Sequence, residues 1–241
     1  MGLANTTMDF TEPTPTLNFL HNVSTRIAAA DPLHEVLDEI VEFVSDLVSC
    51  DSCFIYVKEH NELVLRASKQ PHPEVLDRLK MSVGEGLTGW VAANNEAVVL
   101  PQRAWQDSRF RKFAELPEDA YEAFLSIPVS SRGNVVGVIN VQHKDPYPFS
   151  AREIKIISTL GHLVGAAIER ERLEGEVSEL SGKLAARKVV ERAKGVIQRE
   201  LNISEEEAYS VLQKQARQRR KSMKEISEAI LLADEMRRGS K

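Results

Sequence analysis

Hydrophobic residues recur at helical spacing near both ends of the chain and in short continuous runs between them. Residues 33–48 place Leu, Val and Ile on one face, which predicts a helix that covers a sheet. A shorter helical face precedes it at residues 17–27, and Asp31 before Pro32 predicts an N-cap with proline at the first helical position. Residues 53–68 then hold two apolar runs around a polar turn, which predicts a β-hairpin.

The middle of the chain alternates glycine-rich segments with further apolar runs. Residues 81–92 are punctuated by glycine, which predicts a tight loop leading into a short helix. Residues 97–100 and 124–129 predict strands. Residues 135–141 are almost continuously apolar, which is typical of a strand in the centre of a sheet.

A long helical pattern follows. Ser150 and Glu153 have the spacing of a capping box, and the apolar stripe at residues 154–168 predicts packing on the sheet or on a partner. The pattern continues without proline, and its apolar positions are then spaced 4, 3 and 4 residues apart, at Leu173, Val177, Leu180 and Leu184. We name these four residues the seam. Their spacing favours a coiled coil that forms a homodimer, and a monomeric linker helix is the alternative.

The last part of the chain predicts three helices, because two capping boxes divide residues 187–241. Ser204 precedes Glu207 by three residues, and Ser222 precedes Glu225 by three. The expected inner faces of the three helices are, in order, Val190, Ala193, Ile197 and Leu201; Ala208, Val211, Leu212 and Gln215; and Ile226, Ala229, Ile230 and Ala233.

Charge separates this segment from the rest of the chain. Residues 187–241 hold 14 Lys and Arg against 9 Asp and Glu, a net charge of about +5, whereas the whole chain carries −5. Residues 1–186 therefore carry about −10. Such asymmetry indicates that the basic segment binds a polyanion.

One face of the second helix adds chemistry suited to RNA. Tyr209, Gln213, Arg217 and Arg220 are spaced i, i+4, i+8 and i+11, so they share a stripe. Tyrosine can stack on an unpaired base, and arginine can bind phosphate or stack. The alternative is a solvated charged face without a partner.

Gly195 is unexpected inside the first of these helices, because glycine there costs about 1 kcal/mol relative to alanine. Close approach of another helix is the favoured explanation, and close approach of a nucleic-acid backbone is the alternative. Lys194 beside it is the better candidate for an RNA contact.

These residues resemble those of the ANTAR domain, a small helical RNA-binding module of bacterial antitermination regulators. The resemblance rests, in order, on Ala193-Lys194-Gly195, Glu207-Ala208-Tyr209, Leu212, Ala216, Arg220-Lys221-Ser222-Met223 and Ile226. Gln198 departs from the hydrophobic residue that the family usually has there. The RNA contacts expected from the chemistry and the resemblance together are Arg187, Lys188, Lys194, Tyr209, Gln213, Arg217, Arg220 and Lys221.

The preceding part of the chain resembles a GAF domain over residues 16–170. The resemblance rests on GEGLTGWVA at 84–92, SIPV at 126–129, GVINV at 137–141 and Phe149-Ser150 opening a helix. It implies an α+β fold, in which an antiparallel sheet has helices on one side and a ligand pocket on the other. It also implies sensing rather than catalysis.

An irregular stretch that mixes aromatic and charged groups is typical of small-molecule sites. The residues expected to line the pocket are Tyr56, Trp90, Trp105, Asp107, Arg109, Phe110 and Ile139. The alternative is that the aromatic residues belong to the core and the charged ones are solvated.

Several classes of function are disfavoured. The glycine-rich segment lacks the Gly-Lys-Ser/Thr of nucleotide triphosphatases, and the Asn-Lys-x-x-Asp/Glu pattern of cyclic-nucleotide-binding GAF domains is absent. Cys50 and Cys53 have no second pair for zinc, so we expect buried free thiols in a reducing cytoplasm. His143 is expected at the surface, and no haem ligand or catalytic set can be assembled.

The sequence thus predicts a cytoplasmic regulator that is not an enzyme. We expect a disordered tail at 1–15, a GAF sensor at 16–170, a coiled-coil linker at 171–186 and an all-α, three-helix ANTAR domain at 187–241. No signal peptide or membrane span is expected. The expected partners are RNA stem-loops, a second copy and an unknown ligand, and any cofactor is unknown. A ligand-gated dimer that acts through protein partners without RNA is the alternative.

Overall fold

The computed structural model describes residues 15–69, 75–111 and 121–239. The tail predicted at residues 1–15 lies, except for Pro15, outside the described residues. The chain divides into two compact units, Met1–Arg172 and Leu173–Lys241. Helix α4 (Ala151–Leu201) contributes its first part to one unit and its last part to the other.

The N-terminal unit is built on a six-stranded sheet with the order β3-β2-β1-β6-β5-β4, in which every neighbouring pair is antiparallel. The strands are β1 (Ser52–Glu59), β2 (Glu62–Ser68), β3 (Lys80–Ser82), β4 (Val98–Leu100), β5 (Ala123–Ser131) and β6 (Asn134–His143). The predicted hairpin (β1 and β2) and the central position of β6 are confirmed. β3 was not predicted, because three residues are too few to establish an alternating pattern.

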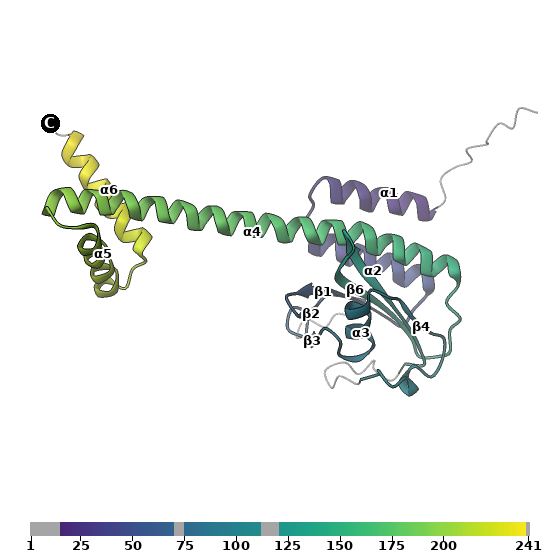
Figure 1. The fold of residues 1–241 in the computed structure, drawn as a ribbon. Coiled ribbons are helices and arrows are strands. Elements are labelled where there is room, and N and C mark those ends of the chain that lie inside the picture. The colour runs from purple at the N-terminus through teal and green to yellow at the C-terminus, as the bar shows by residue number, and fades with distance from the viewer. Residues whose placement is uncertain (1–14, 70–74, 112–120, 240–241) are drawn as a thin grey trace, which may run out of the picture. The chain divides into compact units, whose positions relative to one another are not determined.

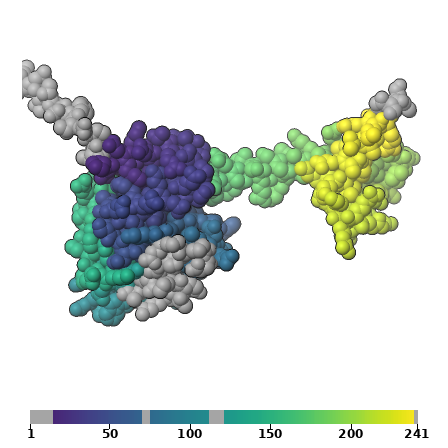
Figure 2. Space-filling view, turned by 180° about the vertical axis from the view of Figure 1, so that it is seen from behind, coloured from purple at the N-terminus to yellow at the C-terminus, as the bar shows by residue number. Residues whose placement is uncertain are grey.

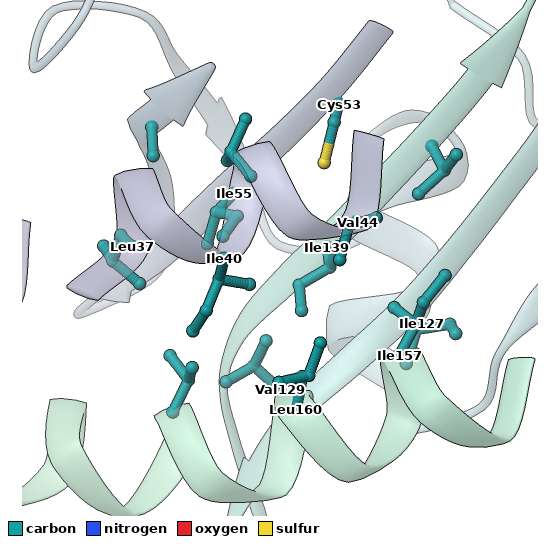
Figure 3. Close-up of a cluster of buried hydrophobic side chains, with 14 of the residues drawn as sticks. Leu37, Ile40, Val44, Cys53, Ile55, Ile127, Val129, Ile139, Ile157 and Leu160 are labelled. Atoms are coloured by element: carbon teal, nitrogen blue, oxygen red, sulfur yellow. The ribbon is translucent and has the colours of Figure 1, made fainter. Parts of the chain in front are cut away.

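Helices cover both faces of this sheet (Figure 1). On one face lie α1 (Pro15–Ala28), α2 (Leu33–Val48) and the first part of α4, and on the other lies α3 (Gly86–Asn94). Figure 3 shows Ile40 of α2, Ile55 and Ile139 of the sheet, and Leu160 of α4 meeting in the first of these layers, where all four are fully buried. Burying one such side chain contributes roughly 1.5–3 kcal/mol to stability.

Two glycines let α4 approach β5 closely. A Cβ on Gly165 would collide with the carbonyl oxygen of Ser130, and one on Gly161 would lie 3.1 Å from the carbonyl oxygen of Pro128. The backbones therefore touch where any other residue would hold the helix away from the sheet.

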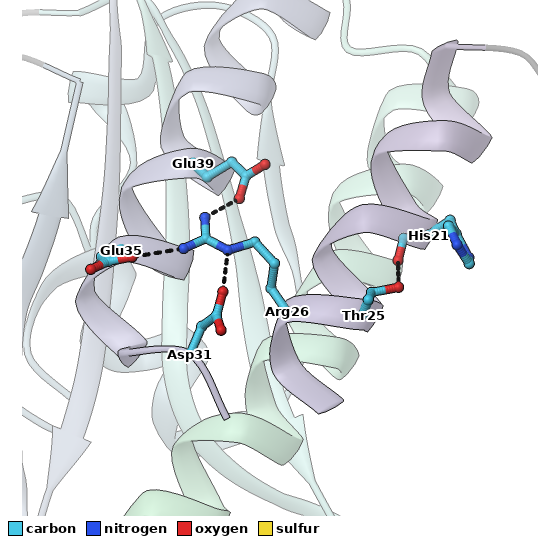
Figure 4. Close-up of polar contacts among 6 residues, drawn as sticks. All are labelled: His21, Thr25, Arg26, Asp31, Glu35 and Glu39. Carbon is cyan, nitrogen blue, oxygen red and sulfur yellow. Dashed lines mark hydrogen bonds and ion pairs between the residues drawn. The ribbon is translucent and has the colours of Figure 1, made fainter. Parts of the chain in front are cut away.

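A charged cluster joins α1 to α2 (Figure 4). The Arg26 guanidinium donates to Asp31 at 2.6 Å, to Glu39 at 2.6 Å and to Glu35 at 2.8 Å. The expectation that Asp31 caps α2 is wrong. Pro32 is the N-cap residue and no side chain caps this helix end, because the Asp31 carboxylate is held by Arg26 in a charge-assisted bond.

The C-terminal unit consists of the last part of α4, α5 (Glu205–Arg219) and α6 (Met223–Gly239). Both predicted capping boxes are confirmed: the Glu207 carboxylate accepts from the Ser204 N–H at 2.8 Å, and the Glu225 carboxylate accepts from the Ser222 N–H at 2.8 Å. The core of the unit is small and consists of Ala193, Ile197, Ala208, Leu212, Ala216 and Ile226.

Three residues predicted for this core are exposed instead. Leu201 lies at the end of α4 with its side chain in solvent, and Ala229 and Ala233 lie on the outer face of α6. The inner face of α6 is formed by Ile226, Ile230 and Leu231. Alanine is common on both buried and exposed faces of helices, so the alanines did not show which face of α6 packs against the core.

Candidate functional site

The exposed face of α5 presents the predicted stripe. Tyr209 is 44% exposed, and Gln213, Arg217 and Arg220 are all exposed. Figure 2 shows the outer surface of α5, in yellow-green, uncovered by the rest of the C-terminal unit. Arg220 ends the helix as its C-cap with a positive φ of 52°, in the left-handed conformation that favours glycine.

Pairing with carboxylates separates the cations of this unit into two groups. Several are paired within the unit, as Arg199 is with Asp234 at 3.5 Å and Lys221 is with Glu225 at 2.7 Å. A second group makes no ion pair with any described carboxylate: Arg187 and Lys188 on α4, and Lys214, Arg217, Arg219 and Arg220 at the end of α5. The unpaired positive charge is therefore concentrated at the C-terminal end of α5.

Lys194 does not belong to this exposed group. Its side chain is only 10% exposed, and its Nζ donates to Glu205 at 2.6 Å and lies 2.8 Å from a Glu191 oxygen. Hydrogen bonds to Glu191 and then to Glu205 raise the pKa of the Lys194 ammonium. The ammonium thus ties α4 to the first turn of α5.

Gly195 has no packing role within the described residues. A Cβ built on it would meet nothing within 4 Å. No helix within the described residues therefore approaches Gly195 closely, contrary to the favoured explanation.

The seam lies on the exposed surface of α4. Val177, Leu180 and Leu184 are 62%, 64% and 56% exposed, and Leu173 is half-buried. Three large apolar side chains at heptad spacing are thus in solvent in the single chain. The predicted continuous helix across this region is confirmed by α4.

In the N-terminal unit, a small hollow opens between the sheet and α3. Its lining includes Tyr56 and Phe110, two of the seven residues predicted for a pocket. The other lining residues are Met81, Glu85, Gly86, Leu87, Thr88, Arg111, Phe124, Asn140 and Gln142.

Four more of the predicted residues, Trp90, Trp105, Asp107 and Arg109, do not line the hollow. The Arg109 guanidinium lies 4.4 Å from the ring centre of Trp90 and donates to both oxygens of Asp107, at 2.9 and 2.8 Å. These hydrogen bonds lower the pKa of Asp107. Trp105 is half exposed, and its Nε1 donates to Glu122 at 3.1 Å.

Ile139 is on the wrong face of the sheet for the predicted pocket. It is fully buried among the side chains of α2 and α4. Successive residues of a strand point to opposite faces, so Asn140 and Gln142 on β6 lie on the other face of the sheet, where they line the hollow. Neither residue was predicted for the pocket, although the alternation of apolar and polar residues along 139–142 indicates that Asn140 and Gln142 share a face.

His143 is not at the surface as expected. It is 6% exposed at the end of β6, and its ring stacks on Tyr147 with centroids 3.9 Å apart. Burial lowers the pKa of His143. The predicted buried free thiols are confirmed for Cys50 and Cys53, and burial raises the pKa of both.

Neither a metal site nor a membrane span emerges from the described ranges. No three His, Cys, Asp or Glu side chains there form a group that could hold a metal ion. None of the helices there combines the length and the apolar content that crossing a membrane requires.

Both parts of the chain are similar in sequence to known protein families. Residues 30–169 match the model of the GAF domain family, and residues 178–231 match that of the ANTAR domain. Over 79 residues, or 31% of this chain, the sequence is 42% identical to the transcriptional regulatory protein PdtaR of Mycobacterium tuberculosis. That match covers only 38% of the length of PdtaR.

Two solved structures resemble the N-terminal unit, and both are GAF domains of phosphoenolpyruvate-protein phosphotransferases. The domain from Acinetobacter is 30% identical with a TM-score of 0.59, and the match covers 68% of this chain and 99% of that one. The domain from Coxiella burnetii is 26% identical with a TM-score of 0.61, and the match covers 67% and 96%. The chain belongs to the GAF domain family and joins its GAF domain to an ANTAR domain of transcriptional regulators.

Proposed function

We propose that this protein is a cytoplasmic antitermination regulator whose ANTAR domain binds RNA stem-loops in nascent transcripts. Binding would prevent a terminator from forming, and the GAF domain would control it by sensing a ligand or partner. The observation that carries the proposal is the concentration of unpaired cations at the end of α5, a helix that also exposes Tyr209. The protein has no catalytic role in this scheme.

The RNA surface we propose combines three kinds of contact. Arg217 and Arg220 supply guanidinium groups for phosphate, and Tyr209 supplies an aromatic face for an unpaired base. Gln213 lies between them and can bond a base edge. Arg187 and Lys188 on α4 add unpaired charge, and Lys221 adds a cation that must be shared with Glu225.

We further propose that the seam forms a parallel homodimer. Heptad spacing and exposure of Val177, Leu180 and Leu184 support it, because these side chains would leave water only on meeting a second helix. A dimer would present two ANTAR domains, which suits a pair of stem-loops.

The proposal is tested by titrating the protein with a two-stem-loop RNA at two salt concentrations. Phosphate contacts release counterions, so the affinity is expected to fall as salt rises. Binding that does not depend on salt, or no binding with and without cell extract as a source of ligand, would count against it.

A second candidate function is a ligand-gated dimer that acts through protein partners without RNA. The exposed Leu232 of α6, beside Ala229 and Ala233, favours it, because exposed apolar groups at helical spacing are typical of protein contacts. The same RNA titration separates the two functions.

A further inference from the structure

The hollow in the GAF domain is lined by polar groups from two elements, the start of α3 and the end of β6, together with aromatic side chains. The first turn of α3 contributes Gly86, Leu87 and Thr88, and β6 contributes Asn140 and Gln142. Tyr56, Phe110 and Phe124 add aromatic side chains to the lining. The lining therefore offers a small molecule both polar and aromatic contacts.

Gln142 is the unusual member of the β6 pair. Its side chain is only 4% exposed, and its Oε1 is buried without a hydrogen-bond partner among the described residues. Asn140, on the same face, uses both amide atoms: its Nδ2 donates to Thr88 Oγ1 and its Oδ1 accepts from Ser126 Oγ, each at 2.7 Å. An unpaired buried acceptor costs roughly 1–3 kcal/mol, so Gln142 is ready to accept from a donor that enters the hollow.

The first turn of α3 supplies backbone donors to the same hollow. The N–H groups of Gly86, Leu87 and Thr88 make no hydrogen bond within the described residues, and the N-cap residue Glu85 makes no side-chain cap bond. Unpaired N–H groups and the helix dipole make such an end an anion site. The exposed Arg111 guanidinium also lines the hollow and is ion-paired at 3.1 Å with Glu85, another lining residue, so an incoming anion would have to replace the Glu85 carboxylate at Arg111.

We propose that this hollow binds a small organic anion that also carries a hydrogen-bond donor. The anionic group would lie at the first turn of α3 and Arg111, and the donor, a hydroxyl or amino group, would bond Gln142 Oε1. The assignment rests on the proposed sensing function and gives its ligand a chemical class. Carboxylates and phosphate monoesters share this chemistry.

Matched probes test separately the need for an anionic group and the need for a hydrogen-bond donor. They also distinguish carboxylates from phosphate monoesters. Calorimetric titration of the full chain, without RNA, would compare malate with succinate and glycerol 3-phosphate with ethyl phosphate. Within each pair only the first has a hydroxyl donor. We expect at least one hydroxyl-bearing anion to bind about tenfold more tightly than its partner, and glycerol, which lacks the anion, not to bind.

Two variants and a control locate the binding. Gln142→Leu should remove the preference for the hydroxyl while preserving the melting temperature, because leucine fills the site without a polar atom. Arg111→Gln should weaken both members of a pair alike. Arg152→Gln, which removes an exposed cation at the start of α4, should change neither.

The inference is overturned if no probe binds, or if the preference for the hydroxyl persists in a folded Gln142→Leu variant. These results are independent of RNA binding. A positive stem-loop titration with negative probe titrations would leave the proposed function intact and remove only the ligand class.

Discussion

The ammonium of Lys194 on α4 lies 2.6 Å from a carboxylate oxygen of Glu205, the first residue of α5. This bond joins two of the three helices of the ANTAR domain, and Glu205 stays near a helix N-terminus, where negative charge is favoured. Lys194 therefore positions the helix that carries the proposed RNA surface.

Lys194→Met tests this positioning role, because methionine keeps the aliphatic stem and removes only the ammonium. We expect a lower melting temperature of the C-terminal helices by circular dichroism and an unchanged salt dependence of RNA binding. Lys183→Met, which removes an exposed cation paired with Glu179, is the matched control. Lys194 would instead be identified as an RNA contact by two results together: a wild-type melting temperature, and a salt dependence of RNA affinity reduced by the equivalent of about one phosphate contact.

Gly165 and Gly195 should respond in opposite ways to alanine. Gly165→Ala would push α4 away from Ser130 and cost about 1–3 kcal/mol, as overpacking does. Gly195→Ala meets open space and should stabilise its helix by about 0.5–1 kcal/mol. Urea unfolding of both variants measures this. A stabilised Gly195→Ala variant with weaker RNA binding would indicate that RNA approaches the backbone there.

His143 predicts a pH dependence of the free energy of unfolding. Burial lowers its pKa, Asp51 and Glu153 act in the opposite direction, and Lys69 acts with burial. The unfolded chain therefore binds the proton more readily, and stability should fall as pH drops below about 6.5. His143→Phe keeps an aromatic ring beside Tyr147 and should reduce this loss between about pH 8 and pH 5.5. An unchanged pH dependence in urea unfolding would exclude His143 as its source.

Leu180→Lys should dissociate the proposed dimer without unfolding the chain, because Leu180 is already exposed in the single chain. A lysine in the seam would place charge between two apolar helix faces. Ser178→Lys, at an exposed position outside the seam and its flanking positions, is the control. Sedimentation at micromolar concentration compares them, and a monomeric wild type would rule out the dimer.

The sequence predicted where helices and strands lie better than it predicted which face of each element a given residue occupies. Strands and capping boxes follow from local patterns, so β6 and the caps at Ser204 and Ser222 appeared as expected. Ile139 was assigned to the wrong face because residues 135–139 include no polar side chain, and the polar residues that mark the opposite face, Asn140 and Gln142, follow only after it.

Residue type alone also led to wrong roles for charged residues whose ion-pair partners lie on another helix. Lys194 looked like a surface cation because Glu205 comes from another helix, and Asp31 looked like a cap because Arg26 comes from the preceding one. The hollow joins β6 to α3 and Arg111, which no local spacing connects. Such contacts require the folded chain.

The central claim, RNA binding by the outer face of α5, is tested most directly by one titration of a stem-loop pair at two salt concentrations. The variants are Arg217→Ala with Arg220→Gly, which suits the left-handed C-cap, together with Tyr209→Ala and the control Lys183→Ala. Circular dichroism confirms that each is folded.

We predict that the double arginine variant binds RNA more weakly. The salt dependence of its affinity should fall by the equivalent of about two phosphate contacts, because each guanidinium contacts a phosphate. Tyr209→Ala should cost roughly 1–3 kcal/mol through lost stacking, and Lys183→Ala should match the wild type. Wild-type affinity in the folded double variant and in Tyr209→Ala would contradict the account.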